Sequence, residues 1–309
     1  MTNPRILVAG LILLVSAALT GCQEAADDAG EQPGPSSDST VGVPDEGGTV
    51  DPTYEVVAEA EGFAVPECVL PAGDGTVFIS NIDAGEDQYW DDDGAGYLSR
   101  ADAATLEVTE ERWADGLNAP KGMCILDDHL WVSDNTRIVA ISLEDPTQRQ
   151  VLEPEDAEQI NDLAAHEGIV YASDTAAALI HRVEDGELLD PIAAPDTVNG
   201  ITFGDSQMWA VSWEQHDIYR MDPTGASEPE PLGVAEHFTN LDAIEELADG
   251  RLLVSDFFGN QVCTVDPADL AVETVAEIES PADLGLDEES GIIYVPQFLV
   301  DRVVALPLP

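Results

Sequence analysis

Short apolar strands recur along the chain from about residue 53 to the end, and six of them share one phrase. In each copy an apolar run ends in a small residue, and a polar or aromatic residue follows it. The small residues stand 53, 40, 39, 43 and 41 positions apart. They are Ser80, Ser133, Ser173, Ser212, Ser255 and Pro296. A repeat of about 40 residues is typical of propeller blades that have four short strands each.

The six copies predict an all-β domain over residues 53–309, folded as a six-bladed β-propeller with four-stranded blades. The sixth copy ends one strand short, at residues 302–308. A strand over residues 54–60 is expected to complete this last blade and close the ring, because an unpaired edge strand would invite aggregation. The long first step is explained by an acidic insertion over residues 83–96, between the second and third strands of blade one.

Two further features of the repeat concern loops. Asp134, Asp174 and Asp256 end their second strands and are expected to cap loops rather than bind a ligand. The insertion of blade one is expected to be a solvated acidic lid rather than a calcium loop, because its acidic spacing departs from that of an EF-hand. Trp90 and Tyr97 flank this lid and could cover a ligand at the channel mouth.

Residues 1–52 have the pattern of an export signal followed by a tether. Arg5 precedes an apolar run over residues 6–19, and Leu-Thr-Gly then leads to Cys22, as in a lipobox. This run is shorter than the roughly 20 residues of a membrane-spanning helix. We expect a lipoprotein signal peptide over residues 1–21, lipid attachment at Cys22 and a disordered acidic tether over residues 22–52. The protein is then exported and held, by lipid alone, on the periplasmic or cell-surface side of a membrane.

Charge narrows the classes of partner. The chain has 10 Lys and Arg residues against 63 Asp and Glu residues, a formal net charge of -53. Nucleic acids and anionic membrane surfaces are excluded as partners on these grounds. Acidic residues are spread along the whole chain and Lys121 is the only lysine, a pattern that suits concentrated salt, where cations screen self-repulsion. An acidic protein of a low-salt environment is the alternative.

Cysteine usage indicates no disulfide framework. With Cys22 assigned to lipid, Cys68, Cys124 and Cys263 remain, an odd number without Cys-x-x-Cys spacing. All three lie in apolar, strand-like runs, so they are expected to be buried thiols in the core. The chain has no Gly-x-Ser-x-Gly elbow, P-loop or dinucleotide fingerprint, so serine-hydrolase, nucleotide and redox-cofactor functions lack support.

One polar residue precedes each copy of the repeat phrase by twelve or thirteen positions. These residues are Glu67, Lys121, Asn161, Asn199, Asp242 and Asp283. The first strand of each blade lines the central channel of a propeller, so they are expected to converge there. Carboxylate and amide oxygens without thiols or imidazoles favour a hard cation such as calcium, magnesium or manganese. The alternative is that such residues merely begin strands through turn chemistry, as the Asn199-Gly200 pair would.

Several short motifs follow one another at specific spacings. They are Pro66-Glu67, Asn161-Asp162, Asn199-Gly200, Leu241-Asp242 and the run Asp249-Gly250-Arg251-Leu252. In their order and spacing these motifs resemble the family of six-bladed propellers that includes senescence marker protein (regucalcin), gluconolactonase and luciferin-regenerating enzyme. The resemblance extends over the folded domain, from residue 54 to residue 309.

The resemblance implies site residues and a reaction. A divalent ion, commonly calcium, would be held by Glu67, Asn199 and Asp242, and Asp242 would also be the catalytic base. Asn161 would contact substrate or lie beside the metal. The implied reaction is lactone hydrolysis, in which the ion polarises the ring carbonyl and a carboxylate manages the proton. Sugar lactonases of the family often carry Arg two residues before the Asn of the Asn-Asp pair. Here that substrate-binding position is Gln159, so sugar-lactone specificity is in doubt.

Lys121 allows two interpretations. Its ammonium could bind a carbonyl or anionic oxygen of the substrate. It could instead form an ion pair with Glu67 or Asp283 and take the place of the cation. The leading hypothesis is a monomeric hydrolase of a lactone or similar small cyclic ester. The alternatives are a non-catalytic propeller that binds a ligand or protein partner on its face, and a chemistry like that of strictosidine synthase or luciferin-regenerating enzyme.

Overall fold

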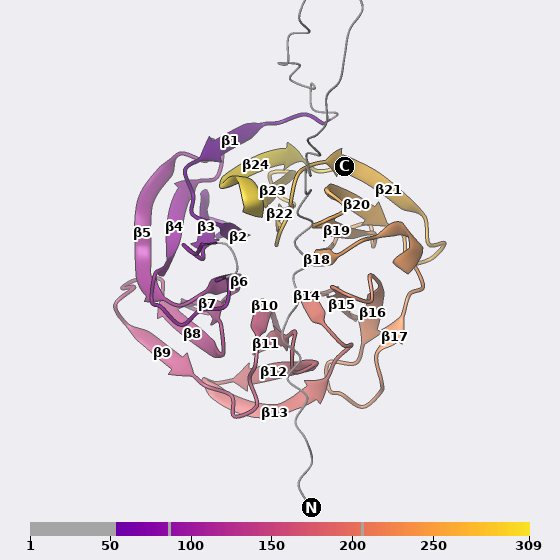
Figure 1. The fold of residues 1–309 in the computed structure, drawn as a ribbon, viewed down its shortest axis with the longest axis horizontal. Coiled ribbons are helices and arrows are strands. Elements are labelled where there is room, and N and C mark those ends of the chain that lie inside the picture. The colour runs from indigo at the N-terminus through magenta and orange to yellow at the C-terminus, as the bar shows by residue number, and fades with distance from the viewer. Residues whose placement is uncertain (1–53, 86–87, 205–206) are drawn as a thin grey trace, which may run out of the picture. The chain divides into compact units, whose positions relative to one another are not determined.

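The computed structural model describes residues 54–85, 88–204 and 207–309. The predicted signal peptide, Cys22 and the predicted tether lie outside these residues. Within them the repeat phrase forms the second strand of every blade (Figure 1). These strands are β3 (Thr76–Asn81), β7 (His129–Asp134), β11 (Ile169–Asp174), β15 (Met208–Ser212), β19 (Leu252–Asp256) and β23 (Ile292–Gln297).

Six four-stranded antiparallel sheets stand around one axis, which confirms the predicted all-β, six-bladed propeller (Figure 1). Each of the first five blades runs outward in chain order. Blade one has β2 (Pro66–Pro71), β3, β4 (Gly96–Asp102) and β5 (Val108–Leu117); blade two has β6 (Pro120–Leu126), β7, β8 (Arg137–Ser142) and β9 (Arg149–Leu152). Blade three has β10 (Ile160–His166), β11, β12 (Leu179–Glu184) and β13 (Glu187–Ala193).

The remaining blades follow the same plan. Blade four has β14 (Val198–Phe203), β15, β16 (Ile218–Met221) and β17 (Glu230–Pro231). Blade five has β18 (Leu241–Glu246), β19, β20 (Gln261–Val265) and β21 (Val272–Glu277). Blade six has β22 (Gly285–Asp287), β23, β24 (Arg302–Pro307) and β1 (Ala58–Glu61). Two short 3-10 helices, η1 (Ala235–His237) and η2 (Phe298–Val300), lie between strands. Across the described ranges, no helix is long and apolar enough to span a membrane.

The ring closes with an N-terminal strand, as the sequence predicts. Strand β1 pairs antiparallel with β24, and Ala58 lies opposite Ala305. The strand begins at Ala58 rather than at residue 54. Tyr54 and Val56 instead pack, partly buried, against the apolar cluster between blades five and six. Strand β24 is therefore paired on both sides, and the two ends of the domain are joined in one sheet.

The hydrophobic core is divided into clusters that lie between neighbouring blades. Between blades one and two, for example, Phe78 and Trp113 pack with Leu130 and Val132. Equivalent clusters fill the other five interfaces of the ring. Cys68, Cys124 and Cys263 are free and buried, which confirms that they belong to the core. Each blade is thus stabilised mainly by burial against its two neighbours.

The aspartates that end the second strands cap loops, as predicted. Asp134 Oδ1 accepts hydrogen bonds from the backbone N–H groups of Asn118 at 2.6 Å and Ala119 at 3.0 Å. Asp174 and Asp256 accept equivalent bonds from the connections that precede β10 and β18. Each carboxylate therefore fixes the chain just before it enters the next inner strand.

Candidate functional site

One polar side chain stands at the start of the inner strand of each blade. We call these residues the axial cluster: Glu67 in β2, Lys121 in β6, Asn161 in β10, Asn199 in β14, Asp242 in β18 and Asp283 just before β22. Their strands surround the propeller axis (Figure 1). All but Asp283 are less than 9% exposed, and Asp283 is partly buried. The structure thus brings together, at one end of the inner strands, residues that the sequence spreads over more than 200 positions.

A β-bulge follows the first residue of five inner strands. In β18 the register shifts between Leu241 and Ile244, so Asp242 falls in the bulge. The N–H of Ala243 donates to Ser255 Oγ at 2.9 Å, and the same bond forms in blades one and three. The small serine of the repeat phrase therefore stabilises the bulge, and the bulge redirects the cluster side chain.

Glycine follows the cluster residue in blades two and four, because neighbouring inner strands approach closely there. A Cβ on Gly122 would lie 2.4 Å from Asp162 Oδ1, and a Cβ on Gly200 would lie 2.5 Å from Asp242 O. Both distances are too short for any side chain. These glycines allow adjacent inner strands to touch, which holds the cluster residues of successive blades close together.

Lys121 lies among carboxylates and aromatic rings. Its Nζ is 3.9 Å from Glu67 Oε1, and both side chains are about 5% exposed. The same Nζ lies 4.3 Å from the centroid of the Trp90 ring and 5.9 Å from that of Phe298. The ion pair with Glu67 is thus present, but 3.9 Å is too long for a hydrogen bond, and the ammonium keeps donors for a ligand.

The amide residues of the cluster make different contacts. Asn199 Nδ2 donates to Asp242 Oδ1 across the boundary between blades four and five. Asn161 Nδ2 donates to Thr175 Oγ1 at 3.3 Å. Gln159 is not part of the cluster: it lies in the connection before β10, partly buried, with its backbone N–H bound to Asp174 Oδ1.

Burial raises the pKa of the cluster carboxyls. The pKa of Asp242 rises to about 6, although the Lys121 charge and the hydrogen bond from Asn199 oppose the shift. Burial also raises the pKa of Glu67, against the Lys121 charge, and that of Asp283, to which neighbouring carboxylates contribute. Burial lowers the pKa of Lys121, against the charges of Glu67 and Asp242. The Lys121 ammonium is thus the only positive charge of the axial cluster, and it stabilises the ionised forms of several buried carboxyls.

Sequence reasoning passed over Asp162 as a site residue. Its carboxylate accepts bonds from the N–H groups of Leu163 at 2.6 Å and Ile201 at 2.7 Å, so it joins blade three to blade four. Burial nevertheless raises its pKa to about 8. A signal was available, because blades two and four have glycine at the equivalent position. Only the approach of neighbouring strands shows what the carboxyl contacts.

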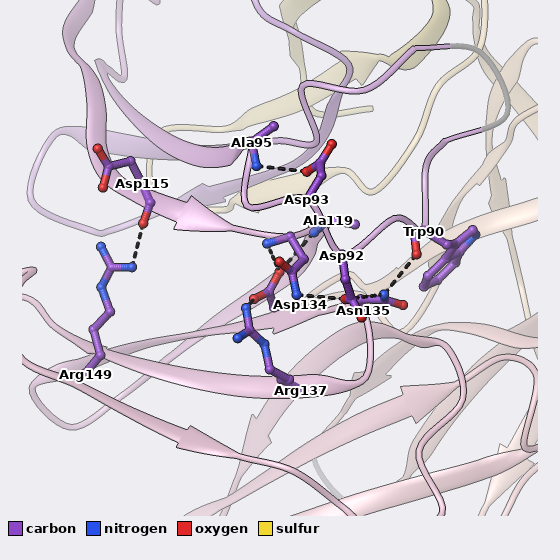
Figure 2. A network of polar contacts seen from close by, with 11 residues as sticks. Trp90, Asp92, Asp93, Ala95, Asp115, Ala119, Asp134, Asn135, Arg137 and Arg149 are labelled. Carbon is purple, nitrogen blue, oxygen red and sulfur yellow. Dashed lines mark hydrogen bonds and ion pairs between the residues drawn. The ribbon is translucent and has the colours of Figure 1, made fainter.

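The insertion of blade one reaches across to blade two (Figure 2). Asn135 Nδ2 donates to the Trp90 carbonyl at 2.9 Å and to Asp92 Oδ1 at 2.8 Å. Asn118 Nδ2 donates to the same oxygen of Asp92 at 2.8 Å. We call Asp92, Asn118 and Asn135 the latch. Through it, the expected lid is tied to the neighbouring blade and places the Trp90 ring over the ammonium.

The donors of the cluster are suited to a hard cation. Within residues 54–85, 88–204 and 207–309, no three His, Cys, Asp or Glu side chains form a metal-binding group. The ligand set implied by the resemblance has two carboxylates, Glu67 and Asp242, and one amide, Asn199. Glu67 Oε2 is buried and has no hydrogen-bond partner. A buried carboxylate oxygen without a donor is expected to have a ligand, an ion or a water as its partner.

Comparisons with known proteins support the fold. No protein-family model matches the chain, and no curated protein matches its sequence. Two similar solved structures are of virginiamycin B lyase from Staphylococcus aureus. One is the selenomethionine protein (13% identity, TM-score 0.57) and the other a catalytically inactive form with Quinupristin (15% identity, TM-score 0.55); each match covers 81% of this chain and 99% of the other.

A third similar structure is a protein of unknown function from Bacteroides thetaiotaomicron. The identity is 13% and the TM-score 0.62, and the match covers 82% of this chain and 75% of the other. At such low identity these likenesses show the propeller fold alone. The resemblance to the regucalcin and gluconolactonase family finds no support from a family model.

Proposed function

We propose that this propeller hydrolyses a lactone or a similar small cyclic ester, using a divalent cation, preferably calcium, at the axial cluster. The observation that carries the proposal is the buried Glu67 Oε2, which has no hydrogen-bond partner, in a cluster with more carboxyls than cations. Ionised carboxylates in a buried site need compensation. A bound divalent cation would supply the positive charge that a single lysine does not provide.

The residues at the axis fit such an ion. Glu67, Asn199 and Asp242 come from three blades and offer carboxylate and amide oxygens, which calcium and magnesium prefer. Asn199 already lies against Asp242. The Asn199 Nδ2 group makes this contact. If the Asn199 side-chain amide rotated by half a turn, its Oδ1 atom would instead lie beside the Asp242 carboxylate, where both oxygens could bind one ion.

Residues of the axial cluster and their neighbours would have separate roles in the reaction. When bound, the ion supplies Lewis acidity toward a carbonyl oxygen and makes water a better nucleophile. Asp242, with a pKa of about 6, suits the role of general base near neutral pH. Lys121 would bind the carbonyl oxygen of the substrate through its free N–H donors, and Asn161 would orient the ring. Gln159 would contact substituents at the mouth, and Trp90 would exclude water from above.

Calcium titration by calorimetry tests the proposal. The purified protein, in molar potassium chloride, is expected to bind one calcium ion, and Asp242→Ala is expected to abolish binding. Asp269→Ala removes an exposed carboxylate of the same domain and is the matched control. If the wild type binds no calcium and Lys121→Met does, the ammonium occupies the place of the cation and the proposal is wrong.

A panel of lactones tests the reaction. Hydrolysis that requires the cation and Asp242 would support the hydrolase. Calcium binding without turnover of any cyclic ester would instead favour the non-catalytic propeller that binds a ligand or protein partner on its face. Turnover of glycosidic or other non-ester compounds would point to a different chemistry on the same fold.

We also propose that the protein is exported and carries lipid on Cys22, as a monomer that contacts the membrane through this lipid only. The support is the lipobox pattern that ends at Cys22. Incorporation of a labelled fatty acid into the wild type and into Cys68→Ser, but not into Cys22→Ser, is the expected result. Equal labelling of all three proteins would rule out Cys22 as the attachment site.

A further inference from the structure

Aromatic side chains form a continuous arc at the end of the ring that holds the axial cluster. Ring centroids are 4.9 Å apart for Tyr89 and Phe298, and 5.5 Å apart for Phe298 and Phe257. Trp213 lies 5.4 Å from Phe257 and 5.7 Å from Phe258. We call these five residues the aromatic arc. Each follows the second strand of its blade, and in five blades the end of that strand pairs with the start of the inner strand.

The arc spans four adjacent blades: one, six, five and four (Figure 1). The corresponding loops of blades two and three carry polar residues instead, Asn135 after β7 and Thr175 after β11. The end of the ring is therefore asymmetric, with an aromatic side and a polar side. Phe257 and Phe298 pack with Ile82, Ala119 and Ala282 in a seventh buried cluster, and Tyr89 and Trp213 lie partly buried against it.

The arc is continuous with the axial cluster. Phe298, in the middle of the arc, lies 5.9 Å from Lys121 Nζ. Phe298 and Phe257 are 7% and 6% exposed, whereas Phe258 at the end of the arc is 52% exposed. Leu299, next to Phe298, is also 52% exposed. The arc thus joins buried rings near Lys121 to an exposed ring at its end.

Exposed apolar residues are concentrated here. Eight large apolar side chains are exposed in the part of the chain that the structure describes, and Phe258, Leu299 and Val300 lie on the two neighbouring loops of blades five and six. The other five are scattered singly around the domain: Val57, Val108, Val151, Leu188 and Leu270. The chain has a net charge of -53, so a group of exposed apolar side chains is unusual on its surface. Because Phe258, Leu299 and Val300 lie near a buried polar site, we infer that an apolar part of a ligand packs on them.

We propose that the aromatic arc binds an aryl or branched alkyl group of the ligand, whose carbonyl oxygen reaches Lys121. This inference rests on the proposed function and names its substrate class: an apolar-substituted cyclic ester rather than a sugar lactone. An aryl group would gain burial and offset stacking on the exposed Phe258 and the partly buried Trp213. The hydroxyls of a sugar would lose water there without finding partners on the rings.

The experiment uses lactams, because they have the shape of lactones but resist hydrolysis. Binding of 5-phenylpyrrolidin-2-one and of pyrrolidin-2-one is measured by calorimetry on the purified protein in molar salt with calcium. The phenyl compound is expected to bind about tenfold more tightly or better, the effect of burying a ring. Phe258→Ser is expected to remove most of this preference. Leu188→Ser, which also removes an exposed apolar side chain but on β13, is the matched control and should leave the preference unchanged.

The outcomes separate the two proposals. A phenyl preference that depends on Phe258, without hydrolysis of any lactone, supports the arc and contradicts the hydrolase. Hydrolysis of sugar lactones with no gain from the phenyl group supports the hydrolase and overturns the arc. If Phe258→Ser and Leu188→Ser reduce the preference for the phenyl lactam equally, the proposal for the arc is also overturned. A dimer in the wild type that Phe258→Ser converts to monomer without a change in lactam binding overturns it too, because the arc would then be a self-association surface. Unchanged melting of Phe258→Ser shows that the variant is folded.

Discussion

Two sets of buried carboxyls lie at the same end of the ring and have opposite electrostatic surroundings. Burial by itself raises the pKa of Asp174, but the contact with His181 Nε2 and bonds from three backbone N–H groups bring that pKa below its ordinary value. For Asp242, the described residues provide one side-chain hydrogen bond, from Asn199, and its pKa is raised to about 6.

The comparison of Asp174 with Asp242 shows that the donors around a buried carboxyl, and not its burial alone, decide the direction of its pKa shift. A carboxylate that accepts several fixed N–H bonds is stabilised as an anion, and its removal leaves those donors unpaired. A carboxyl with few donors is poised to take up a proton or bind a cation. Asp174 belongs to the first kind, and Glu67 and Asp242 belong to the second.

The largest expected effect comes from making the same substitution in both sets. Asp174→Asn should lower the free energy of unfolding by about 3 kcal/mol, because an amide cannot accept all the bonds of the carboxylate. Asp242→Asn should change it by less than about 1 kcal/mol at pH 8 without divalent ions, because a costly charge is removed. Urea denaturation in molar salt measures both. Equal losses in the free energy of unfolding would show that Asp174 and Asp242 contribute equally to stability. Asp222→Asn, at an exposed turn, is the control.

Next in size is the effect of removing the ammonium from the axis. Lys121→Met should lower the free energy of unfolding at pH 8 by about 2 kcal/mol, because Glu67 and Asp242 lose their buried counter-charge. Adding Glu67→Gln should restore most of the loss, and a double-mutant cycle measures this coupling. Arg251→Met breaks an exposed pair with Asp249 and should leave the free energy of unfolding close to that of the wild type. Additive effects of the two axial substitutions would contradict the coupling.

A smaller effect is expected from pH. Burial raises the pKa of Glu245 to about 7, although Thr202 Oγ1 donates to it at 2.8 Å. The folded state therefore holds this proton more tightly than the unfolded state, so the stabilisation is full below pH 4.5 and is lost as pH rises through about 7. The melting temperature without divalent ions should fall by several degrees from pH 5 to pH 8.

Glu245→Gln should make that fall smaller, because its amide stays neutral at every pH. Glu230→Gln, at an exposed position of β17, should leave the fall as in the wild type. The melting temperatures of the wild type and both variants are measured by calorimetry at four or five pH values. An identical slope in Glu245→Gln and in the wild type would show that other carboxyls cause the pH dependence.

The smallest effect on stability concerns the latch, which holds the Trp90 ring over Lys121. Asp92→Ala removes the oxygen shared by Asn118 and Asn135 and should cost about 1 kcal/mol. It should also free Trp90, seen as a shift in tryptophan fluorescence and as faster reaction of Lys121 with an amine reagent. Asp93→Ala is the control, because that carboxylate bonds within its own turn, to the N–H of Ala95 at 2.9 Å (Figure 2). Equal effects would mean that Asp92 does not hold the lid.

Sequence patterns were sufficient to predict most of the fold. The spacing of Ser80, Ser133 and their counterparts gives the blades, and in blades one, three and five the serine bonds the bulge of the adjacent inner strand. A count of twelve or thirteen residues back from the small residue therefore lands on the bulge, and so on Glu67 or Asp242. The start of β1 was predicted too early, because packing on the last two blades, rather than strand propensity, decides the conformation of Tyr54 and Val56.

The sequence by itself thus determined the six blades, the closing strand and the positions that face the axis, since all of these follow from a local period of about 40 residues. Only the tertiary structure decided what those positions contact. Asp162 reaches Ile201 because the inner strands of blades three and four are neighbours in the ring, and Trp90 covers Lys121 because the latch crosses to the next blade. The aromatic arc joins residues from four blades. Such contacts depend on the closure of the ring, which brings together side chains that no local pattern relates.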